Sequence, residues 1–129
     1  MMYALDSDII SYILKGYDNA RKKFNHTIGD EDLYCIPPLV YYEVKRGLDY
    51  LKATAKLKEF KNLYDGSIKS DMTTEIWEKA IEIYVRLKTK GKIVGDGDIF
   101  IAAFCIVNDY TLITNNLKHY GNIEINLMG

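Results

Sequence analysis

Residues 91–116, with the sequence GKIVGDGDIFIAAFCIVNDYTLITNN, decide the expected fold. Residues 99–106 are apolar almost all round, as in a helix that is buried against a parallel sheet. The acidic loop 95–98 precedes them, and Asp98 occupies the position expected for the N-cap of this helix. We therefore predict a buried helix that begins at Asp98 and ends near Asn108.

A short strand and a polar tip follow that helix. Residues 111–114 form a β-branched run that predicts a strand, and Asn115 and Asn116 supply turn residues just beyond its carboxyl end. In open α/β sheets this edge is where ligands bind. The two asparagines are therefore candidates for a functional site.

The rest of the chain also alternates between strands and helices. Residues 2–5 predict a first strand that ends at the polar triplet 6–8. The alternation favours a single domain, residues 1–129, folded as a three-layer α/β/α sandwich with a mostly parallel sheet of four or five strands. The other predicted elements are helices near 9–14, 18–26, 39–51, 54–64 and 75–90, strands over 33–36 and 123–127, a short extra strand over 66–69, and a turn over 117–120.

Composition limits the classes of function. The chain has 17 Lys and Arg against 18 Asp and Glu, a net charge of −1, so nucleic-acid binding requires local clusters of positive charge. Cys35 and Cys105 lie in apolar runs as buried thiols, which suits a reducing cytoplasm, and two histidines are too few for a histidine-based metal site. No signal segment and no membrane span is expected, so we expect a cytoplasmic protein.

Four residues that are far apart in the sequence are expected to face one crevice: Asp6, Glu43, Asp98 and Asn116. Crowded carboxylates repel one another, which raises some of their pKa values, and a divalent cation relieves that repulsion. Oxygen ligands without Cys or His suit Mg²⁺ or Mn²⁺. Such a site predicts hydrolysis of a phosphate ester.

Each of these residues also has a structural explanation. Asp6 to Asp8, and Asp98, are good capping residues, Glu43 suits a solvated helix face or a salt bridge to Arg46, and the asparagine pair suits a turn. Taken singly, Asp98, Glu43 and the asparagines are better explained by structure, and for Asp6 to Asp8 structure and function are about equally favoured. Their joint occurrence at compatible ends of predicted elements favours a site.

Five polar or basic residues around the expected site are candidates for contact with a phosphate backbone. They are Ser7, Lys45, Arg46, Lys92 and Asn115.

Two residues of the 117–120 turn are not predicted to belong to the site. His119 is too isolated to be assigned as a general base, and Tyr120 is one of several tyrosines for which packing is a better explanation than stacking on bases.

Three segments together resemble a PIN domain, most specifically a VapC-type toxin ribonuclease. They are YALDSDIISYIL at 3–14, VYYEVKRGL at 40–48, and GKIVGDGDIFIAAFCIVNDYTLITNNLKHYGNI at 91–123, in the family's order. The resemblance implies a Mg²⁺- or Mn²⁺-dependent endoribonuclease in which Asp6, Glu43 and Asp98 are the shared acidic residues. It places Asn116 at the family's fourth position. It also implies a homodimer, a small antitoxin that blocks the site, and structured RNA, often transfer RNA, as substrate.

The sequence departs from the family pattern at two positions. Asp8 stands where Asn is frequent, and Asn116 stands where many members have Asp. We hypothesise that Asp8 or Asp96 compensates for the missing fourth carboxylate.

Two other functions compete with the nuclease. The segments LDSD and VGDGD resemble the acidic loops of haloacid-dehalogenase-like phosphatases, in which Asp6 would be the nucleophile and Asp8 the acid. That assignment leaves Glu43 and the asparagine pair without a role. The other alternative is a non-catalytic PIN-like module that binds RNA or a protein.

Overall fold

The computed structural model describes residues 2–16, 18–28, 33–121, 123, 125 and 127–128. The acidic run Asp30-Glu31-Asp32, for which the sequence predicts a polar loop, lies outside these residues. The elements, in chain order, are β1 (Met2–Leu5), α1 (Ser7–Leu14), α2 (Asp18–Thr27), β2 (Leu33–Cys35), α3 (Pro38–Tyr50), α4 (Thr54–Asp65), α5 (Thr74–Thr89), α6 (Asp96–Asn108), β3 (Thr111–Ile113), the 3₁₀ turn η1 (Leu117–Tyr120) and β4 (Leu127–Met128).

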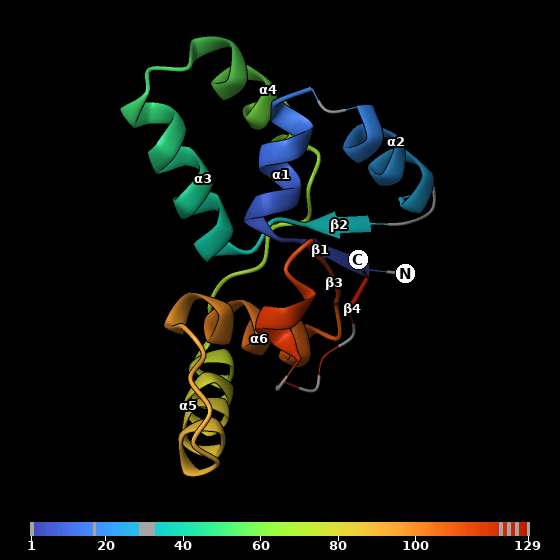
Figure 1. Cartoon of the computed structure of the whole chain (residues 1–129). Coiled ribbons are helices and arrows are strands. Elements are labelled where there is room, and N and C mark those ends of the chain that lie inside the picture. Colours follow the sequence, from blue (N-terminus) through green and yellow to red (C-terminus); the bar gives the residue numbers. More distant parts are fainter. Residues whose placement is uncertain are drawn as a thin grey trace.

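The described strands form one parallel sheet with the order β2-β1-β3-β4 (Figure 1). β1 and β3 are hydrogen-bonded neighbours, with Leu5 opposite Ile113, so both strands end at the same level. The predicted parallel α/β sheet is confirmed. Residues that follow these two strands therefore meet at one edge of the sheet.

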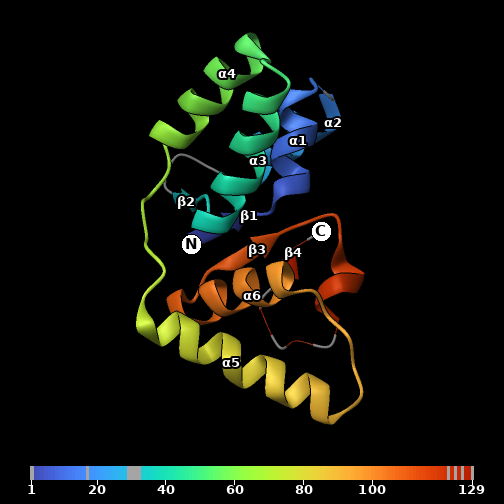
Figure 2. The ribbon, with the colours of Figure 1, turned by 90° about the vertical axis from the view of Figure 1, so that its left-hand side faces the viewer.

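Helices cover both faces of the sheet, as Figure 2 shows. Helices α1 to α4 lie on one side, and α5 and α6 lie on the other, where α5 packs along α6. Helix α6 is buried against the sheet because its apolar residues surround it on nearly all sides, as its sequence predicted. The core side chains of this layer with 0% exposure include Ala102, Ala103 and Phe104.

Two predicted strands differ from the structure. Residues 66–69 contribute only a single bridge, in which Ile68 pairs with Cys35. The last strand begins at Leu127 and not at Ile123, because the backbone N–H of Ile123 still donates to Tyr120 O in a continuation of the turn. Ile123 is buried without being part of the sheet.

Candidate active site

Asp6 lies at the centre of the polar residues at the carboxyl edge of the sheet. It follows β1 directly and is the N-cap of α1, where its Oδ1 accepts a 2.8 Å hydrogen bond from Ser7 N–H. Its Oδ2 accepts one from Thr114 Oγ1 at 2.8 Å and one from the Tyr120 hydroxyl at 3.0 Å. Only 4% of Asp6 is exposed. Three donors therefore fix this buried carboxylate.

Asp98 reaches the same hydroxyl from α6. The Tyr120 hydroxyl lies 3.3 Å from Asp98 Oδ1, and His119 Nδ1 lies 3.2 Å from Asp98 Oδ2. Burial raises the pKa of the Asp98 carboxyl, the charge of His119 lowers it, and the negative charge of Asp6 raises it. Burial also raises the pKa of the Tyr120 phenol, so this group stays a hydrogen-bond donor at neutral pH. A tyrosine hydroxyl thus lies between two of the predicted carboxylates.

The start of α6 differs from the prediction. The helix begins at Asp96, its N-cap is Gly95, and Gly95 contributes no side-chain cap hydrogen bond. Asp98 is therefore the third residue of the helix and not its N-cap. Asp96 and Asp98 both lie in the first turn, where the exposed N–H groups of the helix favour negative charge. The acidic loop that we expected over 95–98 is for the most part already helix.

Glu43 projects from α3 next to the apolar stripe that carries the buried Val40 and Val44. Burial raises the pKa of its carboxyl, and so do the charges of Asp6 and Asp98, whereas Arg46 lowers it. Glu43 is therefore close enough to feel both carboxylates at the sheet edge. The charge of Asp6 thus acts on the carboxyl groups of both Glu43 and Asp98.

Asp8 connects α1 to the loop that follows β3. Its Oδ1 accepts a hydrogen bond from Ile9 N–H at 2.7 Å, and its Oδ2 accepts one from Asn115 N–H at 2.9 Å. Burial raises the pKa of the Asp8 carboxyl, the charge of Asp6 raises it further, and the two N–H groups lower it. Asn116 N–H donates to Thr114 Oγ1 at 2.9 Å. The asparagine backbones thus fix the loop, and both side chains are exposed to solvent.

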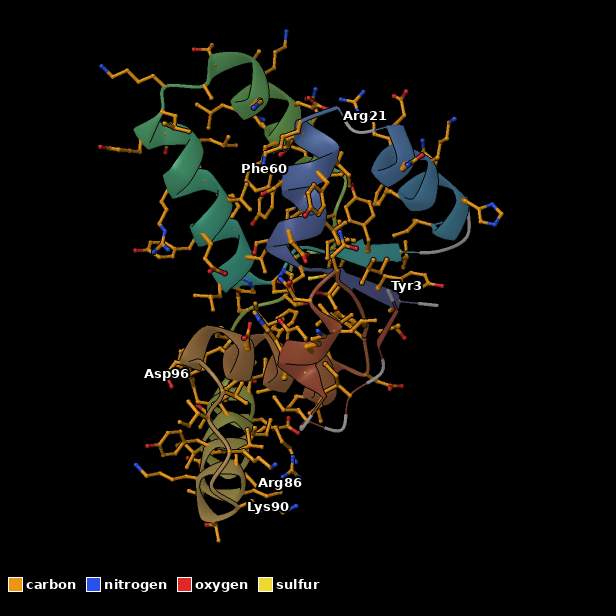
Figure 3. The ribbon with its side chains drawn as sticks, viewed as in Figure 1. Tyr3, Arg21, Phe60, Arg86, Lys90 and Asp96 are labelled. Atoms are coloured by element: carbon orange, nitrogen blue, oxygen red, sulfur yellow. The ribbon has the colours of Figure 1, made fainter. Side chains whose placement is uncertain are left out.

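Asp96 faces a different part of the molecule. It lines an apolar cavity of about 230 Å³ between α5 and α6, together with Trp77, Tyr84 and Phe100 among others. The cavity lining includes none of Asp6, Glu43 and Asp98. Figure 3 shows Asp96 at the N-terminal end of α6. The structure therefore brings Asp8, and not Asp96, to the carboxylates at the sheet edge.

The predicted basic contacts fall into two groups. On α3, Lys45 forms a 2.7 Å ion pair with Asp49, and the Arg46 guanidinium lies over the Tyr42 ring at 4.8 Å. The charge of Arg46 lowers the pKa of Glu43. Lys92 is exposed and follows the end of α5. In Figure 3, the nearby Lys90 lies at the end of α5 that is remote from the sheet.

Sequence reasoning missed three members of the site: Thr114, His119 and Tyr120. The sequence predicts Thr114 as the last residue of a strand, whereas in the structure it follows β3 at the same sheet edge as Asp6. Its position at the end of a predicted parallel strand could have identified Thr114 as a candidate site residue. No sequence pattern distinguished Tyr120 among the eleven tyrosines.

The donor set at this edge fits a hard divalent cation. Carboxylate oxygens are the ligands of Mg²⁺ and Mn²⁺, and Mg²⁺ needs only one or two protein carboxylates because it keeps several waters. Within the described residues, no three Asp, Glu, His or Cys side chains are already gathered closely enough to hold a metal ion. Asp6, Glu43 and Asp98 supply the oxygen donors that such a cation prefers, and these side chains would have to move closer together to bind it jointly.

None of the helices within the described ranges is both long and apolar enough to cross a membrane.

Comparison with known proteins shows the same fold. A family model described as "PIN domain" matches residues 3–121. The chain is 23% identical over 124 residues to Ribonuclease VapC2 of Rickettsia felis. This alignment covers 95% of the chain and 92% of the relative. The chain is also 29% identical over 107 residues to Ribonuclease VapC1 of Methanocaldococcus jannaschii, in an alignment that covers 83% of the chain and 74% of the relative.

A solved structure gives a similar result in three dimensions. The crystal structure of VapBC2 from Rickettsia felis, bound to a DNA fragment from its promoter, contains a chain that superposes with a TM-score of 0.85 and 25% identity. The match covers 99% of this chain and 98% of that one. The similarity extends over nearly the whole fold.

Proposed function

This chain belongs to the PIN domain family, and we propose that it is a metal-dependent endoribonuclease that hydrolyses phosphodiester bonds of RNA. Support comes from two relatives that are named as ribonucleases and align with most of the chain. The observation that carries the proposal is the placement of Asp6 and Asp98 around one hydroxyl, with the Glu43 carboxyl influenced by both charges. We further propose that the enzyme is the toxin of a toxin-antitoxin pair.

Asp6, Glu43 and Asp98 would hold the Mg²⁺ or Mn²⁺ ion. A cation at this place supplies charge stabilisation to the phosphoryl and leaving oxygens and a water nucleophile at neutral pH. Burial is the main cause of the raised pKa values of Glu43 and Asp98, and the charge of Asp6 adds a repulsion that a cation relieves. Asp8 is the best-placed substitute for a fourth carboxylate, because its charge already interacts with that of Asp6.

Other residues of the chain position the substrate and the acidic groups. Thr114 holds Asp6 and also accepts the Asn116 N–H, so the loop and the carboxylate are fixed together. In this proposal, the exposed side chains of Asn115 and Asn116 contact the RNA backbone, and Asn116 occupies the fourth position of the site. Ser7, Lys45, Arg46 and Lys92 supply further contacts with phosphate groups.

The partners and the cellular location are also part of the proposal. The related solved structure is a VapBC complex, which supports a small antitoxin protein as the partner of this chain. We also propose a homodimer that acts in the cytoplasm on structured RNA such as transfer RNA.

The alternative phosphatase assignment has less support. It requires Asp6 to attack phosphorus, yet both Asp6 oxygens accept hydrogen bonds and the residue is almost fully buried. The PIN family match over residues 3–121 also argues against it. If no RNA cleavage is measured, the remaining alternative is a non-catalytic PIN-like module that binds RNA or a protein.

The test is incubation of the purified protein with total RNA in Mg²⁺ or Mn²⁺ and in EDTA, alongside Asp98→Asn. We expect metal-dependent cleavage that Asp98→Asn lowers by about 100-fold or more, because a lost cation ligand removes several kcal/mol of transition-state stabilisation. Asp109→Asn is a matched control at the other end of α6, where Asp109 is exposed and has φ 57°, a conformation that Asn tolerates. Equal cleavage by Asp98→Asn and wild type, or full cleavage in EDTA, would contradict the proposal.

A further inference from the structure

The hydroxyl of Tyr120 touches two acidic residues that come from different parts of the chain. It lies 3.0 Å from Asp6 Oδ2 and 3.3 Å from Asp98 Oδ1. We propose that Tyr120 is a positioning residue that holds these two carboxylates in the relative orientation required to bind a divalent cation. This inference rests on the proposed nuclease function and deepens it.

The hydrogen-bond capacity of Asp6 allows the hydroxyl to remain in place when a cation binds. Each carboxylate oxygen has about two acceptor directions. Asp6 Oδ2 uses both, for Thr114 and Tyr120, whereas Asp6 Oδ1 uses only one, for Ser7 N–H. One direction on Oδ1 therefore stays free for a cation ligand.

Asp98 has similar spare capacity. Its Oδ1 is close to the Tyr120 hydroxyl and its Oδ2 is close to His119 Nδ1, so each oxygen keeps one acceptor direction. The hydroxyl shares its single proton between the two oxygens that it contacts, and both carboxylates keep free lone pairs. Ligating carboxylates are commonly held by such hydrogen bonds, and loss of one typically weakens metal binding by roughly 10- to 100-fold.

The ring of Tyr120 is well placed for this role. Tyr120 is the last residue of η1 and is completely buried, and its carbonyl oxygen accepts the N–H of Ile123. A rigid ring with one terminal hydroxyl holds that oxygen at a fixed position. A tyrosine that merely filled the core would satisfy its hydroxyl without linking two charged groups.

The test measures the affinity of the protein for Mn²⁺ by calorimetry without RNA. Tyr120→Phe removes the hydroxyl and keeps the ring, and we expect Mn²⁺ binding about 10-fold weaker or more, with an unchanged KM for RNA. The matched control is Tyr110→Phe, because the hydroxyl of the buried Tyr110 bonds to Ser70 and not to a carboxylate. We expect wild-type Mn²⁺ affinity for this control. Thermal unfolding in EDTA checks that both variants fold.

A second measurement leaves the Tyr120 hydroxyl in place. With 3-fluorotyrosine incorporated at position 120, we expect the ¹⁹F signal to shift saturably as Mg²⁺ is added, and the same label at position 110 to stay constant. A folded Tyr120→Phe protein with Mn²⁺ affinity within twofold of wild type, or a ¹⁹F signal at position 120 that does not respond to Mg²⁺, overturns the role of Tyr120. Wild-type protein that binds no Mn²⁺ contradicts the proposed function itself.

Discussion

The Thr114 hydroxyl donates a 2.8 Å hydrogen bond to Asp6 Oδ2, and the two residues are 108 positions apart in the chain. The parallel pairing of β1 with β3 places them side by side, because the strands end at Leu5 and Ile113 in the same register. The central carboxylate of the site thus depends on a residue from the last part of the fold.

Thr114→Val should therefore destabilise the protein. The change keeps the side-chain shape, but Asp6 loses a buried hydrogen bond and Asn116 N–H loses its acceptor. We expect the free energy of unfolding in EDTA to fall by about 2 kcal/mol, the usual range for a hydrogen bond to a charged group. Thr111→Val, the same change at the half-buried start of β3, should alter it by no more than about 0.5 kcal/mol. Urea unfolding of both variants tests the difference, and equal effects would contradict it.

Asp98→Asn should change how stability depends on pH when no metal is present. The pKa of Asp98 is raised above its ordinary value of 3.8, so the folded protein holds this proton more tightly than the unfolded chain. Stability from this group is therefore lost as pH rises from about 3.8 through the raised pKa. Asn carries no such penalty and still offers an oxygen to Tyr120.

We expect Asp98→Asn to gain stability relative to wild type as pH rises above about 4, with little difference below that pH. Urea unfolding in EDTA at pH 3.5 and at pH 7 measures this. A variant that loses stability relative to wild type between those two values would show that the pKa of Asp98 is lowered by folding.

Comparison of the two single variants Asp8→Asn and Asp96→Asn should identify the fourth acidic residue of the proposed metal site. The Asp8 carboxylate feels the charge of Asp6 and binds Asn115 N–H, whereas Asp96 lines the apolar cavity between α5 and α6. We expect Asp8→Asn to lower the rate of RNA cleavage and the affinity for Mn²⁺ by roughly 10-fold. For Asp96→Asn we expect changes below about twofold. The reverse result would assign the role to Asp96.

Arg46→Gln should weaken the binding of RNA more than it slows the chemical step. Arg46 follows Glu43 by about one turn of α3, its charge lowers the Glu43 pKa, and its guanidinium lies over the Tyr42 ring. We expect KM to rise by about threefold or more, a smaller change in kcat, and a weaker dependence of KM on salt. Lys92→Gln should raise KM less, because Lys92 follows the end of α5. A larger effect at Lys92 would move the RNA path to that side.

The sequence predicted the candidate site residues that come directly after a predicted strand. The apolar run 2–5 and the β-branched run 111–114 marked two strand ends, and parallel strands deliver their following residues to one edge. Asp6 was found in this way. Glu43 was found because a carboxylate beside the buried Val40 and Val44 is unusual.

The sequence could not resolve Asp96 from Asp98. Gly95 gives no side-chain signal for an N-cap, so the N-cap of α6 was predicted at Asp98, three residues too late. Successive helix residues are about 100° apart, so residues two apart point to nearly opposite sides. One aspartate therefore meets Tyr120, and the other meets the α5 side. The role of Tyr120 depends on how η1 folds back, which no periodic pattern encodes.

The pairing of β1 with β3 has a consequence for the protein while it is being synthesised. A nascent chain of about one hundred residues already contains Asp6, Glu43 and Asp98. It does not yet contain the Thr114 and Tyr120 hydroxyls that hold the carboxylate of Asp6. If the chain is the toxic nuclease that we propose, an incomplete nascent polypeptide would be inert. The harmful activity would then begin only after Thr114 and Tyr120 have been synthesised and have reached the sheet edge.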